Sequence, residues 1–515
     1  MPVRMVEDPE EDNSSDNGGS GNGGGGGGFP KLPGGGGLWS IALSLLFRSP
    51  KIGIAVLLIG GIVYYFMGQS SATNSNIGLG CTLDQQKYDQ TNVYASLDGG
   101  KNALPSKISL EQFCPKRLNQ GKQGSCVAWA SAYAARTILY SRATGQDPNK
   151  VAFSPAFLYN QIHLEDCQGS YLPYAVDNMN EVGALPLREF PYNDNDCDNK
   201  PSNTQIAQAK QFIIKGANRL SKDGDDYAVD IQAIKQNLAQ GAPVTIGMMV
   251  GGSFMQNMEG QKVWHPERSD RDMDGFGGHA MCVMGYDDNV EGGAFQLMNS
   301  WGENWGDRGF AWVRYRDFEF FVKEAYGLYP MGSAQKPQNP NVLGVKLGLL
   351  NTTTANQYIS LSKKTPNSFA TQQVLPIGTK FKVEITNTEE CYTYVFGQET
   401  DGTSYVLFPY TAKHSPYCGI VGTRLFPKDM SMQLDKVGNK DYIGIVVSKK
   451  ELDYTTLNNQ LKSSKQTTFE GKFQEVFATT AIPNVAFTTT AQTIDFEANT
   501  QQKDVVWAIL ELNKK

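Results

Sequence analysis

Histidine is scarce in this sequence: its 515 residues include only four, His163, His265, His279 and His414. Any imidazole that acts as a general base or binds a metal must therefore be one of these four. The sequence also lacks the His-Glu-X-X-His pattern of a helical zinc site, which excludes that class of metallopeptidase.

A basic surplus is lacking as well. The 46 lysines and arginines are outnumbered by 52 aspartates and glutamates, which gives a formal net charge of -6. Proteins that bind DNA or RNA usually carry an excess of positive charge, so nucleic acid is not an expected partner. With 40% hydrophobic and 11% aromatic residues the chain can still bury a sizeable core, and its length indicates two or three domains.

The amino-terminal segment has few apolar side chains. Residues 1–37 contain 13 of the 54 glycines and an acidic cluster between Glu7 and Asp16. Such a composition cannot bury enough apolar surface to offset the entropy of ordering the chain. We therefore predict a disordered tail at 1–37.

Charge is absent from residues 52–68, IGIAVLLIGGIVYYFMG. As a helix, this run would cover about 25 Å of a hydrocarbon layer about 30 Å thick. Arg48 and Lys51 precede the run, and Tyr64 and Tyr65 lie near its end, where aromatic side chains favour the membrane interface. We therefore predict a single transmembrane helix, with the amino-terminal tail in the cytoplasm and the rest of the chain in the periplasm or outside the cell.

The preceding apolar run is too short to span a membrane, so we predict that residues 38–51 form an interfacial segment. Two alternatives remain open for residues 52–68. One is a buried core helix, which the flanking charges disfavour. The other is a signal peptide cleaved after Ala72, although the leader before the apolar run is much longer than usual.

Composition changes twice more along the chain. After a polar spacer at 69–103, residues 104–330 mix helical and strand-like patterns, and a linker with Pro and Asn follows at 331–341. Residues 342–515 contain short alternating runs such as KFKVEIT and YIGIVVS, separated by Gly, Asn, Asp and Pro turns. This pattern is typical of an all-β sandwich or barrel.

The most informative segment is NQGKQGSCVAWASAYAARTILYSRATG, which begins as a polar turn and continues with strong helix formers. It puts Cys126 at a helix amino terminus, where unpaired N–H groups and the helix dipole favour a thiolate. A thiolate that attacks a carbonyl needs a base and a group that orients the base. The segment GGHAMCVMGYDD offers His279 at the start of an apolar strand, and MNSWGENWGDRGFAWVRY offers Asn299.

These three segments resemble the papain-like cysteine peptidases of family C1, in the order found in that family. His279 and Asn299 follow Cys126 by 153 and 173 residues, close to the roughly 130 to 150 expected of such enzymes. The resemblance covers residues 104–330. It implies an α+β domain with two lobes, one helical and one like a β-barrel.

The resemblance also implies a role for each catalytic residue. Cys126 would be the nucleophile, and His279 would be the base that later protonates the leaving amine. Asn299 would hold the imidazole in the useful tautomer, and Gln120 would donate its side-chain amide to the oxyanion. Six further residues would bind or border the substrate: Gly169, Ser170, Tyr171, Leu172, Gly278 and Trp301. Trp301 would also shield the bond between Asn299 and His279 from water.

The cysteines depart from the family pattern. Gln123 stands where many members have a half-cystine, so Cys167 lacks its usual partner, and Cys197 lacks one near Asn160. We therefore expect these two leftover cysteines to pair with each other and to stabilise the fold by about 2 to 4 kcal/mol. The natural remaining pairs are Cys391 with Cys418 and Cys81 with Cys114, and Cys282 is expected to be a buried free thiol. Three disulfides suit an oxidising compartment.

An acidic segment near His279 resembles a metal site only in part. Asp270, Asp272 and Asp274 precede a glycine as in the first half of a calcium loop, but the position of the final bidentate Glu is occupied by Met281. A solvated acidic loop is the better interpretation. We expect no metal and no other cofactor.

The sequence therefore predicts a bacterial, membrane-anchored cysteine endopeptidase that cleaves proteins or peptides. The long inhibitory pro-segment of many family members is missing. The carboxy-terminal domain resembles a bacterial β domain of unknown function that is often fused to peptidases, and we favour a role in recognising a protein or the cell envelope. Two alternatives remain open: a catalytically silent surface protein that binds peptides, and a transglutaminase-like acyl transferase, whose third catalytic residue is normally acidic rather than Asn299.

Overall fold

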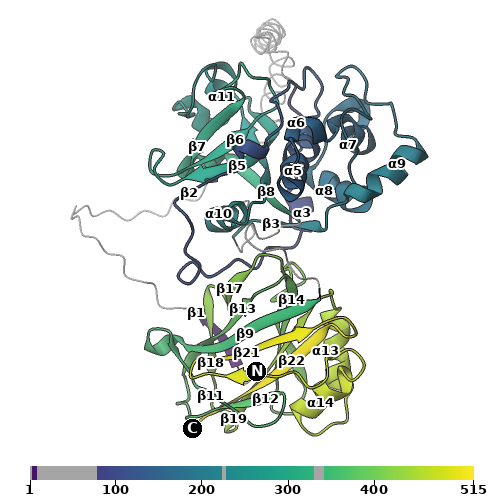
Figure 1. Ribbon diagram of the computed structural model, residues 1–515. Coiled ribbons are helices and arrows are strands. Elements are labelled where there is room, and N and C mark those ends of the chain that lie inside the picture. Colours follow the sequence, from purple (N-terminus) through teal and green to yellow (C-terminus); the bar gives the residue numbers. More distant parts are fainter. Residues whose placement is uncertain (1–2, 8–77, 223–227, 330–340) are drawn as a thin grey trace, which may run out of the picture. The chain divides into compact units, whose positions relative to one another are not determined.

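The computed structural model describes residues 3–7, 78–222, 228–329 and 341–515 (Figure 1). The predicted interfacial segment and transmembrane helix, 38–51 and 52–68, lie outside the described residues, as does almost all of the predicted linker. Within the described part of the chain, no helix combines the length and the apolar character needed to cross a bilayer.

The helical lobe contains one long helical stretch that begins at Cys126 and ends at Gly145. It consists of α4 (Cys126–Ala128), a π-helical segment (Trp129–Arg136) and α5 (Thr137–Thr144). Gly145 ends it because this residue adopts the left-handed conformation, with a φ of 71°. The other helices of this lobe are α3 (Gln85–Tyr88), α6 (Pro148–Val151), α7 (Pro155–Ile162), α8 (Leu172–Glu181) and α9 (Asn203–Ala209).

The second lobe is built on a seven-stranded sheet with the order β3-β8-β4-β5-β6-β7, to which β2 is added along β5. Its strands are β2 (Lys107–Ser109), β3 (Gly216–Arg219), β4 (Val244–Val250), β5 (Gly277–Asp287), β6 (Ala294–Met298), β7 (Phe310–Arg314) and β8 (Val322–Tyr329). Three helices accompany it: α10 (Ile231–Ala239), α11 (Gly252–Gln256) and α12 (Tyr315–Phe321). All its pairings are antiparallel.

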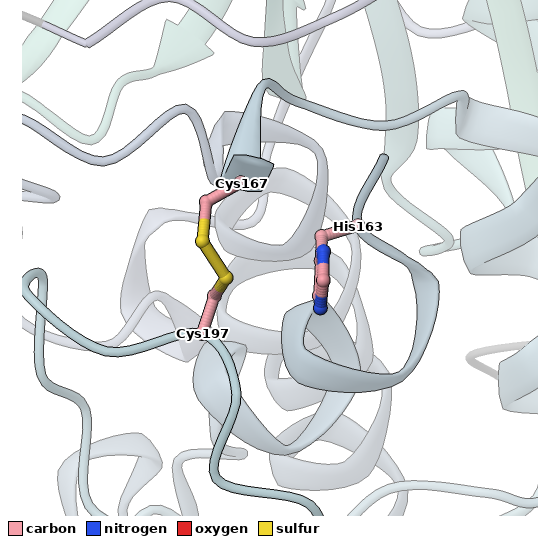
Figure 2. A group of neighbouring side chains, drawn as sticks. All are labelled: His163, Cys167 and Cys197. Carbon is pink, nitrogen blue, oxygen red and sulfur yellow. A yellow bond between two sulfur atoms is a disulfide. The ribbon is translucent and has the colours of Figure 1, made fainter. Parts of the chain in front are cut away.

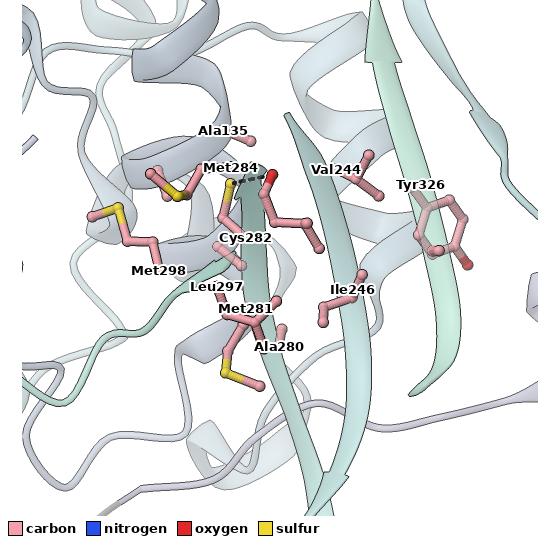
Figure 3. Packing of buried hydrophobic residues seen from close by; sticks show 14 of the residues in the cluster. Ala135, Val244, Ile246, Ala280, Met281, Cys282, Met284, Leu297, Met298 and Tyr326 are labelled. Carbon is pink, nitrogen blue, oxygen red and sulfur yellow. Dashed lines mark hydrogen bonds between the residues drawn. The ribbon is translucent and has the colours of Figure 1, made fainter. Parts of the chain in front are cut away.

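The core of this domain lies between the long helix and the sheet. Ala135 packs from the helix toward Val244 and Ile246 of β4 and Met284 of β5 (Figure 3). β5 is buried along nearly its whole length, which explains its continuous apolar sequence. This packing brings the start of the long helix against the start of β5. The predicted two-lobed α+β architecture is confirmed.

The carboxy-terminal domain consists of two sheets that share one core. The first sheet contains β1 (Val3–Glu7), β9 (Val342–Asn351), β10 (Gln357–Tyr358), β13 (Lys380–Asn387), β17 (Gly422–Phe426), β18 (Met430–Leu434), β20 (Thr488–Thr489) and β21 (Thr493–Asn499). The second contains β11 (Leu361–Lys363), β12 (Ser368–Thr371), β14 (Cys391–Gln398), β15 (Ser404–Phe408), β16 (Tyr417–Cys418), β19 (Lys440–Ser448) and β22 (Val505–Asn513).

Alternating side chains of both sheets build the shared core. Leu343, Val345 and Leu347 occupy every second position of β9 and are buried in it. Ile443 and Ile445 occupy alternate positions of β19 and belong to the same core. This period of two is the one that the sequence shows, and it is typical of two sheets packed face to face.

Two helices cover the outer face of the second sheet, α13 (Tyr454–Ser463) and α14 (Phe469–Val476). Their apolar side chains, such as Leu461 and Phe473, pack on Phe396 and Trp507 of that sheet. The prediction of a β-rich domain at 342–515 is confirmed. The alternating runs in its sequence did not indicate the two helices.

Two predictions about the amino-terminal part of the chain are wrong. Residues 3–7, expected to belong to a disordered tail, form β1 and pair antiparallel with β18. The sequence VRMVE favours a strand, but the glycine-rich composition of 1–37 as a whole led to the prediction of a disordered tail. The described part of the predicted spacer, 78–103, is also packed: Tyr88, Val93, Tyr94 and Leu97 are buried.

Candidate active site

Cys126 is the first residue of α4 and is fully buried. The backbone N–H of Ala280, on β5, points at its sulfur with an N to Sγ distance of 3.4 Å. Burial raises the pKa of the Cys126 thiol to about 12, although the N–H groups of Ala280, Val127, Cys126 itself and Gly80 act to lower it. The thiol of Cys126 is therefore neutral in this structure, because removal of water outweighs the helix terminus, and the imidazolium on which the predicted thiolate depends is not present.

His279 lies on β5 next to Ala280 and is also fully buried. Its Nε2 lies 2.8 Å from Oδ1 of Asn299, and its Nδ1 has no hydrogen-bond partner among the described residues. Burial lowers the pKa of His279 to about 4, against a raising contribution from the bond to Asn299. The imidazole is therefore neutral, with Nε2–H donated to Asn299 and Nδ1 left as an acceptor.

Asn299 follows β6 directly, and its side-chain amide lies next to Nε2 of the imidazole. Its Oδ1 accepts a second bond from the backbone N–H of Ser300, at 2.7 Å. The indole of Trp301 stacks on the ring of His279, with 4.4 Å between centroids and 29° between planes. Because Trp301 is itself only 5% exposed, it separates the imidazole and Asn299 from water.

Gln120 is fully buried in the turn before α4. Its Oε1 accepts a hydrogen bond from the hydroxyl of Ser300, at 2.6 Å, which fixes which end of the amide carries the N–H groups. Its Nε2 donates to the carbonyl oxygens of Gly78 and Gln123, at 2.8 and 2.9 Å. Sequence reasoning missed Ser300, although its place directly after Asn299 could have indicated it.

The predicted substrate strip lies beside these residues, along the seam between Cys126, Ser170 and Gly278, which we call the catalytic cleft. The N–H of Ser170 donates to Gly80 O and its carbonyl accepts from Thr82 N, each at 2.9 Å. The carbonyl of Gly278 accepts from the N–H of Cys81, at 3.1 Å. These contacts are the backbone pairing expected of the strip, but the partner is the chain itself.

The remaining predicted residues lie around this strip. Gly169 has a φ of 102°, and a β-carbon there would lie 2.4 Å from Gly80 O. Leu172 is fully buried at the start of α8, whereas Tyr171 is partly exposed and holds its ring 5.0 Å from that of Tyr174. The structure thus places the predicted substrate strip close to the four predicted catalytic residues.

Glu324, on β8, was missed by sequence reasoning because no motif surrounds it. It is 1% exposed, and its Oε1 accepts the backbone N–H of Asp84 at 3.2 Å. Burial raises its pKa to about 7. Glu324 is the register partner of Gly247 on β4, and the Gly247 position lies against Leu172, one of the residues predicted to border the substrate.

One of the three predicted disulfides is present. Cys167 and Cys197 are bonded across a separation of 30 residues, and His163 lies beside them (Figure 2). A His and two Cys could in principle bind a metal, but both sulfurs are already used in the disulfide. Nδ1 of His163 contacts Leu164 O at 2.8 Å, and its Nε2 lies 3.0 Å from the amine of Lys200.

The other two disulfide predictions are wrong. Cys391 and Cys418 are register partners on β14 and β16, but their thiols are free. Cys81 lies in the cleft, whereas the thiol of Cys114 contacts Leu110 O at 3.6 Å, and both are free. Pairing by elimination cannot tell neighbouring thiols from bonded ones. Cys282 is a buried free thiol, as predicted.

The acidic loop before β5 also differs from expectation in one residue. Asp270 is 2% exposed rather than solvated. Its carboxylate accepts the backbone N–H groups of Ser253 and Glu267, at 3.2 and 2.7 Å, and the hydroxyl of Ser253. Asp270 therefore holds two loops together.

Comparisons with known proteins point to the same part of the chain. Residues 110–326 match the family model described as papain family cysteine protease, and residues 374–451 match a domain of unknown function. An uncharacterized peptidase C1-like protein of Acanthamoeba polyphaga mimivirus is 29% identical over 208 residues, which cover 39% of this chain and 64% of that protein. Cathepsin K of Mus musculus is 29% identical over 198 residues, covering 38% of this chain and 54% of that protein.

Among solved structures, xylellain, a cysteine protease from Xylella fastidiosa, matches with 23% identity and a TM-score of 0.41. The match covers 49% of this chain and 96% of that one. The chain spans less than two thirds of the length of the curated relatives named above. The family match supports a papain-family cysteine peptidase domain within this chain.

Proposed function

We propose that this protein is a papain-like cysteine endopeptidase that hydrolyses peptide bonds through a thioester on Cys126. The observation that carries the proposal is the buried contact between His279 Nε2 and Asn299 Oδ1 at 2.8 Å, beside a cysteine at a helix start. The match of residues 110–326 to the family model and the similarity to cathepsin K support it.

The unpaired Nδ1 of His279 is the proton acceptor that a neutral thiol needs. We propose that His279 takes the proton of Cys126 as the sulfur attacks the substrate carbonyl. The bond to Asn299 keeps the other ring nitrogen protonated and stabilises the imidazolium that forms. His279 then gives its proton to the leaving amine, and water hydrolyses the thioester.

The negative oxygen of the tetrahedral intermediate needs donors that are already in position. The N–H of Cys126 and the amide of Gln120 would supply them, and the Ser300 hydroxyl holds that amide in the correct orientation. Donors of this kind each contribute about 100-fold to 1,000-fold in rate. An extended substrate would pair with Ser170 and Gly278, so proteins and peptides are the proposed substrates.

The test follows new amino termini released from a reduced, unfolded protein. We expect release by the native chain to depend on Cys126, so that Cys126→Ala abolishes it. No release by correctly oxidised protein would favour a silent peptide-binding protein. Incorporation of an added amine without hydrolysis would favour an acyl transferase, which Asn299 in place of an acidic residue argues against.

We also propose that the chain acts at a membrane of a bacterial envelope, attached by residues 52–68. The support is the uncharged run of 17 residues with its basic and aromatic flanks. Residues 3–7 pair with β18, which argues against a single crossing, so the proposal is attachment through residues 52–68 with both flanks on the same side of the membrane. Protease treatment of intact cells that carry an amino-terminal tag tests this: cleavage of the tag on the peptidase side is expected, and protection of the tag would indicate one crossing and contradict it.

For the carboxy-terminal domain we propose recognition of a protein or envelope component. Its support is the two-sheet architecture and the match of residues 374–451 to a domain of unknown function. Photo-crosslinking from the exposed Val437 in cells tests it. A discrete adduct supports recognition, and the absence of any adduct contradicts it.

A further inference from the structure

The carboxy-terminal domain buries a lysine completely at one end of its core. The side chain of Lys514 is 0% exposed, and this residue follows β22 directly. Side chains of β22 alternate between its two faces, and Leu510 and Leu512 belong to the core. The period of two therefore directs Lys514 into the space between the two sheets. Lysine is almost never found in such a place unless a partner accompanies it.

Asp441, on β19, is that partner. β19 and β22 pair antiparallel, with Asp441 opposite Leu512. Ile443 and Ile445 lie in the core at the same alternation, and the side chain of Asp441 is 1% exposed. The amine of Lys514 lies 2.8 and 2.9 Å from the two carboxylate oxygens of Asp441. Two strands thus bring an amine and a carboxyl group together inside the core.

A second carboxyl group reaches the same amine. Oδ1 of Asp435, just after β18, lies 2.6 Å from Nζ of Lys514. This oxygen also accepts the backbone N–H of Val437 at 2.9 Å, which holds the carboxyl in place. The side chain of Asp435 is 13% exposed, so it is the member of the cluster nearest to water. We refer to Lys514, Asp441 and Asp435 as the buried triad.

The surroundings of the buried triad are apolar. Leu375 forms a backbone bridge with Lys514 and is 6% exposed, and Leu434, next to Asp435, is 1% exposed. Burial raises the pKa of Asp441 to about 6, against a lowering contribution from Lys514. An environment without water favours neutral forms, so a proton moves more easily from the amine to the carboxylate. A neutral amine beside a carboxylic acid is the pair of reactants that forms an amide.

The distances within the buried triad suit bond formation. The carboxyl carbon of Asp441 lies between the two oxygens that Lys514 contacts, so the nitrogen is within about 3.5 Å of it. Groups held at this distance react as if they were present at very high concentration. A buried site also admits little water to reverse the reaction. An ion pair there retains the cost of removing two charges from water, which a neutral amide avoids.

We propose that Lys514 and Asp441 join in an amide bond, a covalent cross-link between the end of β22 and the start of β19. The amine nitrogen attacks the carboxyl carbon, the bond from that carbon to its hydroxyl oxygen breaks, and one water leaves. Asp435 takes a proton from the attacking nitrogen and passes it to the departing oxygen, so it ends the reaction as it began. The reaction exchanges no electrons with another molecule.

A second lysine on the same strands provides an internal control. Lys440 precedes Asp441, and its amine lies 2.6 Å from a carboxylate oxygen of Glu511 on β22. Because the side chain of Lys440 is 38% exposed, this pair stays hydrated and charged. Burial, rather than a short distance alone, therefore separates the buried triad from an ordinary salt bridge.

The test is peptide mass spectrometry of the full-length protein after reduction, denaturation and digestion with trypsin. The cross-link lowers the summed mass of the joined peptides by about 18 Da, the mass of one water. Trypsin cannot cut after an acylated lysine, so we expect one branched peptide that joins residues 441–449 to residues 504–515. Separate peptides that end at Lys449 and Lys514, with no branched product, would overturn the proposal and leave an ion pair.

Three variants assign the bond to its residues. Lys514→Arg keeps the positive charge but should abolish the branched peptide, whereas Lys440→Arg should retain the cross-link. Asp435→Ser keeps an acceptor for the N–H of Val437 but removes the proton carrier, so it should lower the cross-linked fraction at least about tenfold. A branched peptide that persists in Lys514→Arg would overturn the proposal, and an unchanged fraction in Asp435→Ser would contradict the role of Asp435.

A second measurement does not depend on how the variants fold. The native chain is unfolded in denaturant, and its amines are then acetylated. A free Lys514 becomes accessible under these conditions and reacts like Lys440, whereas a cross-linked one has no amine to modify. We therefore expect acetylation of Lys440 and none of Lys514. Acetylation of both lysines to the same extent would contradict the amide bond.

Discussion

The catalytic cleft and the sheet core beside it each bury a free cysteine, and the two thiols have different surroundings. Cys126 and Cys282 are both fully buried, and burial raises the pKa of both. Backbone N–H groups face the sulfur of Cys126. The sulfur of Cys282 instead lies 3.8 Å from the carbonyl of Val283, among apolar side chains (Figure 3).

The comparison shows that burial alone does not make a nucleophile. Burial keeps both thiols protonated. The reactivity of each thiol therefore depends on the hydrogen-bond donors and bases that surround its sulfur. Cys126 has the helix terminus, the Ala280 amide and the neighbouring His279. Cys282 has none of these on its side of β5.

The largest expected effect separates the two thiols by function. Cys126→Ala should lower kcat/KM for peptide hydrolysis by at least about 1,000-fold, because it removes the nucleophile. Cys282→Ala should keep the activity and lower the free energy of unfolding by about 1 kcal/mol. Steady-state kinetics and urea unfolding of both variants measure this. Equal losses of activity in Cys126→Ala and Cys282→Ala would contradict different roles for the two thiols.

The next effect concerns paired cysteines. Cys167→Ser opens the 30-residue loop closed by the disulfide and should lower the free energy of unfolding by about 2 to 4 kcal/mol. Cys391→Ala is the control, since its thiol faces another cysteine without a bond, and it should cost less. Thermal unfolding with and without reductant checks both. Reductant should destabilise the native chain but leave Cys167→Ser unchanged.

The smallest effect is on the pH dependence of the free energy of unfolding, through the buried carboxyl of Glu324. The pKa of Glu324 is raised to about 7, so the folded state binds a proton that the unfolded chain releases above its ordinary value of 4.5. This contribution is fully present below pH 4.5 and is lost as the pH rises through 7. Glu324→Gln should therefore flatten the fall in stability between these values, by about 1 to 3 kcal/mol in total.

His279 acts in the opposite direction, since its pKa is lowered to about 4 from 6.5. Burial of its neutral form stabilises the fold above pH 6.5, and that contribution is lost as the pH falls through 4. Unfolding measured from about pH 4 to pH 8 in the native chain and in Glu324→Gln separates the two groups. An unchanged slope in Glu324→Gln would contradict the buried, protonated carboxyl.

The sequence predicted the catalytic residues because their chemistry depends on local patterns. A cysteine after a glycine turn, a histidine at a strand start and an Asn before Ser-Trp-Gly can each be read from neighbouring residues. The two-lobed fold of the peptidase domain was implied by the family resemblance, and the β-rich fold of the carboxy-terminal domain followed from its alternating runs. Glu324 could not be predicted, because its place opposite Gly247 depends on the pairing of β4 with β8.

The packing of residues 78–83, GLGCTL, could not be predicted for a similar reason. The segment has no charge and little propensity for helix or strand, so its composition indicates a spacer. Its position depends on contacts with Gln120, Ser170 and Gly278, each distant in sequence. Disulfide pairing failed for a related reason, since counting cysteines gives no distances.

The most direct test of the central claim is to trap the covalent intermediate. The native protein is mixed with an activated N-acyl peptide ester, quenched in acid within a turnover and mapped by mass spectrometry. The account predicts an acyl group on Cys126, absent from the same protein carrying Cys126→Ala. Hydrolysis with no adduct on Cys126, or with an adduct on another residue, would contradict it.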